Sequence, residues 1–157
     1  MPQLVKGGKY VFGISLVKEG FKIQVPPEAY QEYELYKSNK IILFPGSKTS
    51  GGFGINSPLR LMNSQLSGLI DLIGFDAKTG EFSTKEFTIT KMGNRILSWT
   101  YISEKGVFRL NPELAGIFGL TVSHRMVVVR GGSIGPGFIA KGPIHNLAMK
   151  HPELQIY

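Results

Sequence analysis

Basic and amide side chains occupy two places in this sequence where alternation predicts an exposed strand face. They are Lys18, Lys22 and Gln24 at the first place, and Lys105 and Arg109 at the second. The alternate positions, which should point inward, are Ile23, Val25, Phe108 and Leu110. On a β-ribbon, cations can hold phosphates while an amide or guanidinium group reaches base edges, so these residues could contact duplex DNA. The alternative is a solvated strand face with ordinary lysines.

Catalysis would need converging polar groups, and the sequence offers few of them. Its three histidines, His124, His145 and His151, show neither metal-ligand spacing nor a paired acid, and we expect them at the surface. Glu28 and Glu113 follow predicted helix starts, where exposed N–H groups and the helix dipole explain a carboxylate. The chain has no cysteine, which excludes disulfides and thiolate chemistry. We therefore expect no enzyme, no metal and no cofactor.

Two glycine-rich segments, 46–52 and 131–137, could belong to a different kind of site. They do not match a phosphate-binding loop, because that motif leads into a helix and these segments lead into strands. They could form walls around a ligand, or they could be strand connections packed closely by their backbones, and we favour the second interpretation. The first would make the protein a non-catalytic ligand-binding or protein-interaction barrel.

An internal repeat relates these features to one another. A shift of 85 positions aligns residues 6–58 with residues 91–143 without a gap, so that Pro27 falls on Pro112 and Phe53 on Phe138. Such self-similarity indicates copies of one structural unit. We interpret the chain as two units, 1–72 and 86–157, joined by a connector, 73–85, and closing around one shared core.

The order of elements predicted for each unit is β, β, α, β, β. Alternating apolar residues predict a strand over residues 10–17. In the second unit, the apolar residues Leu97, Trp99 and Tyr101 fall on the matching alternate positions. Turns at Gly20 and Gly106 lead into the strands that carry the basic residues.

Proline and first-turn acids predict short helices that begin near Pro27 and Pro112 and run to Leu35 and Leu120, with Asn111 as a cap. The apolar runs 41–44 and 126–129 are typical of strands buried on both faces, and the final strands follow the glycine-rich segments. Beyond the aligned region, 64–73 and 144–150 look helical, and the connector reads as a mobile loop or a short hairpin.

Composition indicates a folded protein with a positive field. The chain has 18 Lys and Arg against 11 Asp and Glu, for a net charge of +7. Such a charge attracts phosphate backbones, anionic membranes or acidic partners, although it also serves solubility. No segment approaches the roughly 20 apolar residues that cross a bilayer, and the first residues do not resemble a signal peptide. We expect a cytoplasmic protein with no membrane partner.

The run 19–28, Glu-Gly-Phe-Lys-Ile-Gln-Val-Pro-Pro-Glu, is followed by a predicted helix ending at Leu35 and by Asn-Lys-Ile-Ile-Leu at 39–43. This pattern resembles the SpoVT/AbrB swapped-hairpin domain, whose usual form is a hairpin, an "I/V-P-x-E" motif, a helix, a "G-D" turn and two strands. The second unit is similar from Gly106 to Leu120 and from Met126 onward. The resemblance covers residues 9–56 and 94–141.

The resemblance implies a mixed α/β, mainly β fold in which tandem swapped-hairpin, barrel-like halves form a pseudo-dimer within one chain. Members are prokaryotic transcription regulators or antitoxins that bind double-stranded DNA, and MraZ-type regulators carry both domains in one chain. Lys22 fills the family's basic position four residues before the motif proline, whereas Val107 stands there in the second unit. DNA contact would then fall to Lys18, Lys22, Gln24, Lys105 and Arg109, and association between copies of the chain is left open.

Overall fold

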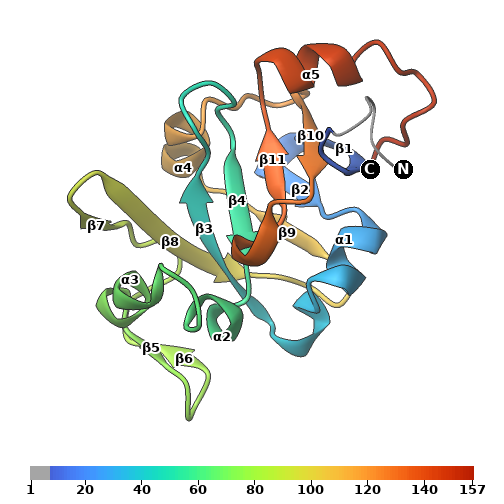
Figure 1. Ribbon diagram of the computed structural model, residues 1–157. Helices are drawn as coiled ribbons and strands as arrows, with labels where there is room; N and C mark the ends of the chain where they lie inside the picture. The colour runs from blue at the N-terminus through green and yellow to red at the C-terminus, as the bar shows by residue number, and fades with distance from the viewer. Residues whose placement is uncertain (1–7) are drawn as a thin grey trace.

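The computed structural model describes residues 8–157, apart from the side chain of Ser133. The start of the first unit at residues 1–7, including Lys6 and the stretch compared with a signal peptide, lies outside the described residues. The fold is mixed α/β and mainly β, as predicted, and its centre is a seven-stranded antiparallel sheet (Figure 1). In spatial order the strands are β1 (Val11–Leu16), β10 (Arg125–Val129), β11 (Gly137–Ile139), β4 (Phe53–Asn56), β3 (Lys40–Pro45), β8 (Arg95–Tyr101) and β7 (Thr90–Met92).

Strands of the two units are interleaved within this sheet. The first strand of the N-terminal unit, β1, pairs with β10, and the first strand of the C-terminal unit, β8, pairs with β3. At the centre β11 pairs with β4, with Phe138 opposite Phe53. Their rings stack with centroids 4.7 Å apart and planes 7° apart. Each unit therefore completes its sheet with strands of the other.

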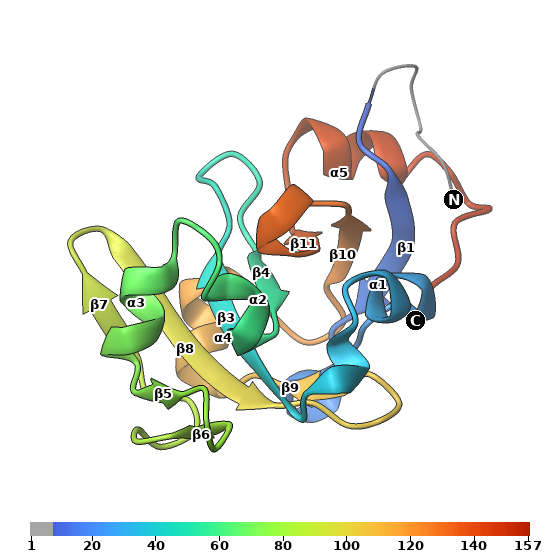
Figure 2. The same ribbon diagram turned by 60° about the horizontal axis from the view of Figure 1, so that its bottom comes forward.

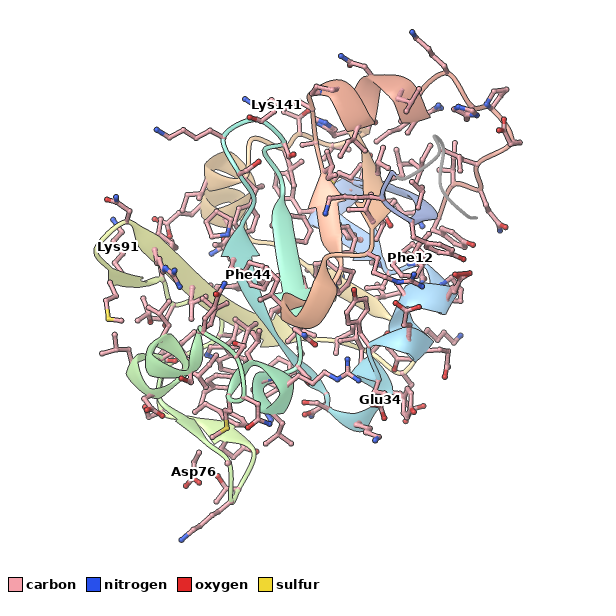
Figure 3. The ribbon with its side chains drawn as sticks, viewed as in Figure 1. Phe12, Glu34, Phe44, Asp76, Lys91 and Lys141 are labelled. Carbon is pink, nitrogen blue, oxygen red and sulfur yellow. The ribbon has the colours of Figure 1, made fainter. Side chains whose placement is uncertain are left out.

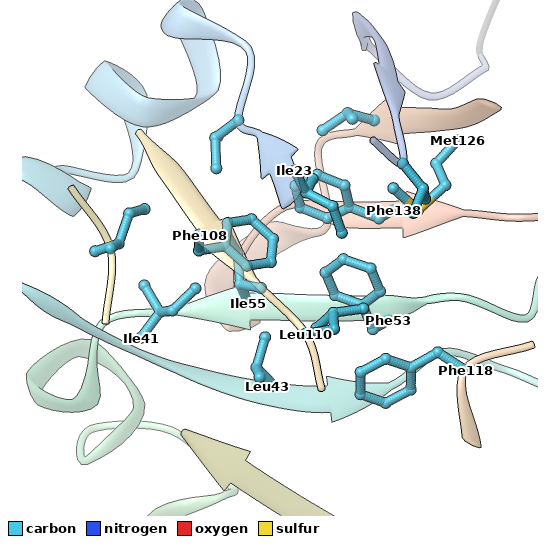
Figure 4. Close-up of a cluster of buried hydrophobic side chains, with 14 of the residues drawn as sticks. Ile23, Ile41, Leu43, Phe53, Ile55, Phe108, Leu110, Phe118, Met126 and Phe138 are labelled. Carbon is cyan, nitrogen blue, oxygen red and sulfur yellow. The ribbon is translucent and has the colours of Figure 1, made fainter. Parts of the chain in front are cut away.

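A smaller layer covers one face of the sheet and lies behind it in Figure 1. It consists of a two-stranded ribbon, β2 (Lys22–Gln24) with β9 (Val107–Arg109), flanked by α1 (Pro27–Glu32) and α4 (Pro112–Ile117). The four residues predicted to point inward from this ribbon are fully buried: Ile23, Val25, Phe108 and Leu110. They join one cluster with residues of both units, including Phe53 and Phe138 (Figure 4).

Three helices cover the opposite face: α2 (Pro58–Leu61), α3 (Ser67–Leu72) and α5 (Pro143–Ala148). Strand β3 sends Ile41 toward the ribbon and Ile42 toward α2 and α3, and β10 alternates in the same way with Val128 and Val127. The predicted burial of both strands on two faces is therefore confirmed. Helices α3 and α5 lie where the sequence predicted helical tails, whereas α2 was not predicted.

The connector forms a hairpin, which was one of its two predicted states. Strand β5 (Phe75–Asp76) pairs with β6 (Glu81–Phe82), and the ring of Phe82 stacks on Trp99 at 4.4 Å. The chain then adds β7 to the outer edge of β8. The positions of the first unit that correspond to β7, residues 5–7, lie outside the described residues.

The barrel expected from the family resemblance is wrong, because the sheet stays open. On the free edge of β1, the Ile14 amide donates to the Gln155 carbonyl at 2.9 Å, and the Tyr157 amide donates to the Ile14 carbonyl at 2.8 Å. At the other end, β7 occupies the edge of β8. Both edges that a barrel would join are thus paired with other segments, the edge of β1 with the C-terminal residues and the edge of β8 with β7.

Both ribbon-side helices end one turn earlier than the sequence predicted, at a residue in the left-handed region. The Asn111 side chain accepts from the Leu114 amide at 2.9 Å, which confirms the predicted cap of α4. After α4 the left-handed position is Gly119, with φ +72°, and after α1 it is Glu34, with φ +53°. The two turns into the ribbon also use positive φ, at Gly20 and Gly106 as predicted. The remaining helical turns are the 3₁₀ segments η1 (Glu19–Phe21), η2 (Leu35–Lys37) and η3 (Gly132–Ile134).

Two glycines of this region give a test of the helix end. A Cβ at Gly119 or at Gly116 would meet no atom within 4 Å, so only backbone conformation separates the two positions. Gly119→Ala should lower the free energy of unfolding by about 1–2 kcal/mol, because an L-residue is strained at this φ. Gly116→Ala, inside α4, should raise it by about 0.5–1 kcal/mol. Urea denaturation measures both, and a stabilising Gly119→Ala would contradict the helix end described here.

Candidate nucleic-acid interface

The register of the ribbon places two cations directly opposite each other. Hydrogen bonds join the Leu110 amide to the Phe21 carbonyl at 3.1 Å and the Val25 amide to the Gly106 carbonyl at 2.9 Å. Lys22 lies opposite Arg109, one residue along each strand from the bond between Phe21 and Leu110. Lys22 and Arg109 therefore form a non-hydrogen-bonded pair of the ribbon. In such pairs the side chains approach most closely. The predicted outward face therefore carries adjacent positive groups.

The basic side chains of this face have no carboxylate partner in the described part of the chain. Lys18, Lys22, Lys105 and Arg109 are all exposed, and none takes part in an ion pair within 4.0 Å. Like charges directly opposite in a ribbon destabilise it. This arrangement therefore lowers the stability of the isolated protein, and a bound anion would reduce the repulsion between the two cations.

A wide depression of about 700 Å³ adjoins the β9 side of this face. Lys22, Lys105 and Arg109 contribute three cations to its lining, against the single carboxylate of Glu86. That carboxylate accepts the Thr100 hydroxyl at 2.5 Å and the Tyr101 amide at 3.4 Å. In Figure 2, β9 lies at the lower edge of the molecule, next to the end of β8. The depression is therefore a broad, net positive surface.

Gln24 lies differently from the cations. It is half-buried, and its amide nitrogen donates to the Lys105 carbonyl at 2.6 Å and to the Val25 carbonyl at 3.0 Å. The Gln24 amide group is thus bound both to the turn of the other unit, through Lys105, and to the neighbouring backbone of its own unit, through Val25. A base contact by Gln24 would require these bonds to break or would have to use its side-chain oxygen.

Sequence reasoning placed two related hairpin tips side by side but missed how their charges combine. The antiparallel register puts Val107 opposite Gln24, so the ribbon's two cations gather at one end. It also missed Tyr101, which was grouped with the apolar residues of its strand but is 48% exposed in the same depression. The sequence could have indicated the exposure of Tyr101, because this residue ends β8 next to the polar turn 103–106.

The histidines differ in part from the prediction. All three are half-buried rather than exposed, and His151 does have a paired acid, Glu153, at 2.7 Å. His124 and His145 contact the backbone oxygens of Ala140 and Arg125. Across residues 8–157, no group of three or more histidine, aspartate or glutamate side chains is arranged to hold a metal ion.

The glycine-rich segments pack by their backbones, as the favoured interpretation held. A Cβ built on Gly52 would lie 1.9 Å from the Phe138 carbonyl oxygen, and one on Gly135 would lie 1.9 Å from the Ile55 carbonyl oxygen. The Gly52 amide donates to the Phe118 carbonyl at 3.1 Å. Close contact between the two units therefore accounts for glycine at these positions.

Comparison with known proteins found no matching family model, no significantly similar curated protein and no matching solved structure. Of the helices in the described residues, none has the length and apolar character to span a bilayer.

The opposed cations predict a measurable cost in stability. Arg109→Glu should raise the free energy of unfolding by roughly 0.2–1 kcal/mol, because it turns a like-charge pair with Lys22 into an opposite-charge pair. The gain should shrink at about 1 M salt, where the Debye length is near 3 Å. Denaturant unfolding at two salt concentrations checks both statements.

Two controls separate the pair from net charge. Lys105→Glu makes the same charge change on the same surface without an opposed partner and should have a smaller effect. Lys22→Glu combined with Arg109→Glu restores a like-charge pair and should return stability toward that of the unmodified protein. Equal effects of Arg109→Glu and Lys105→Glu would show that the Lys22–Arg109 pair carries no special repulsion.

Proposed function

We propose that this protein binds double-stranded DNA through the β2–β9 ribbon and acts as a transcriptional regulator of the SpoVT/AbrB type. The observation that carries the proposal is the pair of Lys22 and Arg109, which are exposed, directly opposite each other, and form no ion pair with any described residue. A phosphate backbone supplies the negative charge that would neutralise this pair, and its counterions would be released on binding.

The rigidity of the ribbon supports this role. Ile23, Val25, Phe108 and Leu110 anchor its inner face in the main core, so the outer side chains start from a fixed backbone. A two-stranded ribbon fits the major groove. In this arrangement Lys18, Lys22 and Lys105 hold phosphates, and Arg109 can also reach a base edge.

The topology supports the family assignment within this proposal. Two swapped-hairpin domains in one chain should exchange strands between their halves, and β1 and β8 each pair with the third strand of the other unit. Each of these strands also leads into its ribbon strand, through the bridges Lys18–Lys22 and Ile102–Phe108. The strand order is thus compatible with an intrachain pseudo-dimer, although its sheet is open.

The competing function, a binding or interaction module built on the glycine-rich segments, has weaker support. Backbone contacts between the units already explain the glycines, as described above for Gly52 and Gly135. No corresponding packing requirement explains the opposed cations. We therefore favour the ribbon as the functional surface.

Fluorescence anisotropy with labelled duplex across a salt series tests the proposal, and fragments from the upstream region of the protein's own gene should be included. Log K should fall linearly with log salt concentration, by about 0.9 for each phosphate neutralised. Lys22→Glu and Arg109→Glu should each weaken binding at least tenfold and flatten the slope. They remove a phosphate contact and introduce repulsion.

Lys48→Glu and Lys141→Glu are matched controls, because these lysines are exposed and lie outside the ribbon (Figure 3 labels Lys141). They make the same change in net charge and should weaken binding far less. If all four variants weaken binding equally, the protein attracts DNA only through its overall charge. Absence of binding at low salt would reject the proposal.

A further inference from the structure

A second cavity, remote from the ribbon, has the composition of a small-molecule site. It measures about 250 Å³ and lies between α3, the β7–β8 hairpin and the end of β3, which are neighbours in Figure 1. Most of its lining is apolar: Phe44, Pro45, Leu66, Leu69, Ile96, Leu97 and Ile134. Gly46 and three polar residues, Gln65, Asn94 and Arg95, complete the lining.

We propose that this cavity binds a small apolar carboxylic acid, with Arg95 as the carboxylate ligand. Arg95 is exposed and makes no ion pair with any described residue. An apolar pocket with a few convergent polar groups is the usual form of a ligand site, and guanidinium binds carboxylate in a two-pronged geometry. No carboxylate of the protein is present in the lining to compete for it.

The walls of the cavity are fixed by packing. Phe44 lies over β4, where a Cβ on Gly54 would come within 2.3 Å of its ring, and Figure 3 labels its side chain. Leu66, Leu69 and Leu97 belong to the buried cluster beneath α3. Ile134 comes from η3 of the other unit, so a bound ligand would contact both units.

The setting of Arg130 differs from that of Arg95. Arg130 lies 4.3 Å from the centroid of the Tyr10 ring and forms an ion pair with Glu32 at 2.5 Å. A guanidinium in this second setting thus has an internal carboxylate, whereas Arg95 has none.

The size and charge of the cavity restrict the ligand. Drug-sized ligands occupy pockets of about 300–1,000 Å³, so this one suits a smaller molecule. A single cation over an apolar floor favours one carboxylate attached to an aromatic ring or a short alkyl chain. A nucleotide, with several phosphate charges, does not fit this lining.

Isothermal titration calorimetry with phenylacetate, octanoate and the neutral phenylacetamide tests the proposal on the full chain. Phenylacetate should bind at least about tenfold more tightly than phenylacetamide, because its charge-assisted bonds to Arg95 exceed neutral ones. Arg95→Gln should remove that difference and leave phenylacetamide binding unchanged. Lys91→Gln, an exposed neighbour outside the lining, should change neither affinity.

A second variant locates the site without depending on charge. Ile134→Trp should fill the cavity and abolish binding of acid and amide together, while circular dichroism and the melting temperature show that the protein stays folded. Backbone amide shifts of residues 94–97 should respond to phenylacetate in the unmodified protein. Equal affinities for acid and amide, unchanged binding by Arg95→Gln, or no saturable binding of either acid would overturn the proposal. DNA binding is measured separately, so each proposal can fail alone.

Discussion

The pairing of β4 with β11 is the contact on which the rest of the structure depends. Phe53 and Phe138 face each other there, and Phe53 also stacks on Phe118 with centroids 5.0 Å apart. The ring of Phe108, from the ribbon, meets both central rings edge-on, at 5.9 Å and 6.0 Å. Figure 4 shows these side chains in one continuous cluster. Aromatic burial of this kind contributes heavily to stability, and here it joins both units and holds the ribbon over the sheet.

The ribbon illustrates a local conflict inside a well-packed fold. The inner face of the ribbon is apolar and buried, whereas its outer face places Lys22 opposite Arg109, and neither forms an ion pair with a carboxylate in residues 8–157. Local arrangements that cost stability without an evident gain are expected at functional sites. The composition of the two surfaces explains why we place DNA on the ribbon and a small ligand elsewhere. The ribbon depression is wide and lined by three cations, whereas the α3 cavity is smaller and has a single cation among mainly apolar side chains.

The sequence predicted those elements that depend on local or repeated signals. Residue types alone predicted the buried strands at 41–44 and 126–129 and the helix start at Pro112 with its Asn111 cap. They also predicted which side of the ribbon points inward. The open sheet was not predicted, because it depends on the pairing of the C-terminal residues with β1 and of β7 with β8, and neither of these segments was predicted to be a strand. The Lys22–Arg109 pair depends on the register between two distant strands, which no single segment of sequence encodes. The α3 cavity likewise arises from segments far apart in the chain.

The exchange of strands between the units also constrains how the chain is made. Strand β1 is synthesised well before its ladder partner β10 and before residues 155–157, which pair with its other edge. Contacts of such long sequence separation slow folding, since a large loop must close before they form. During translation the N-terminal unit therefore leaves the ribosome with both edges of β1 unpaired. Its apolar residues would remain available to chaperones or to other nascent chains until β10 and residues 155–157 have emerged.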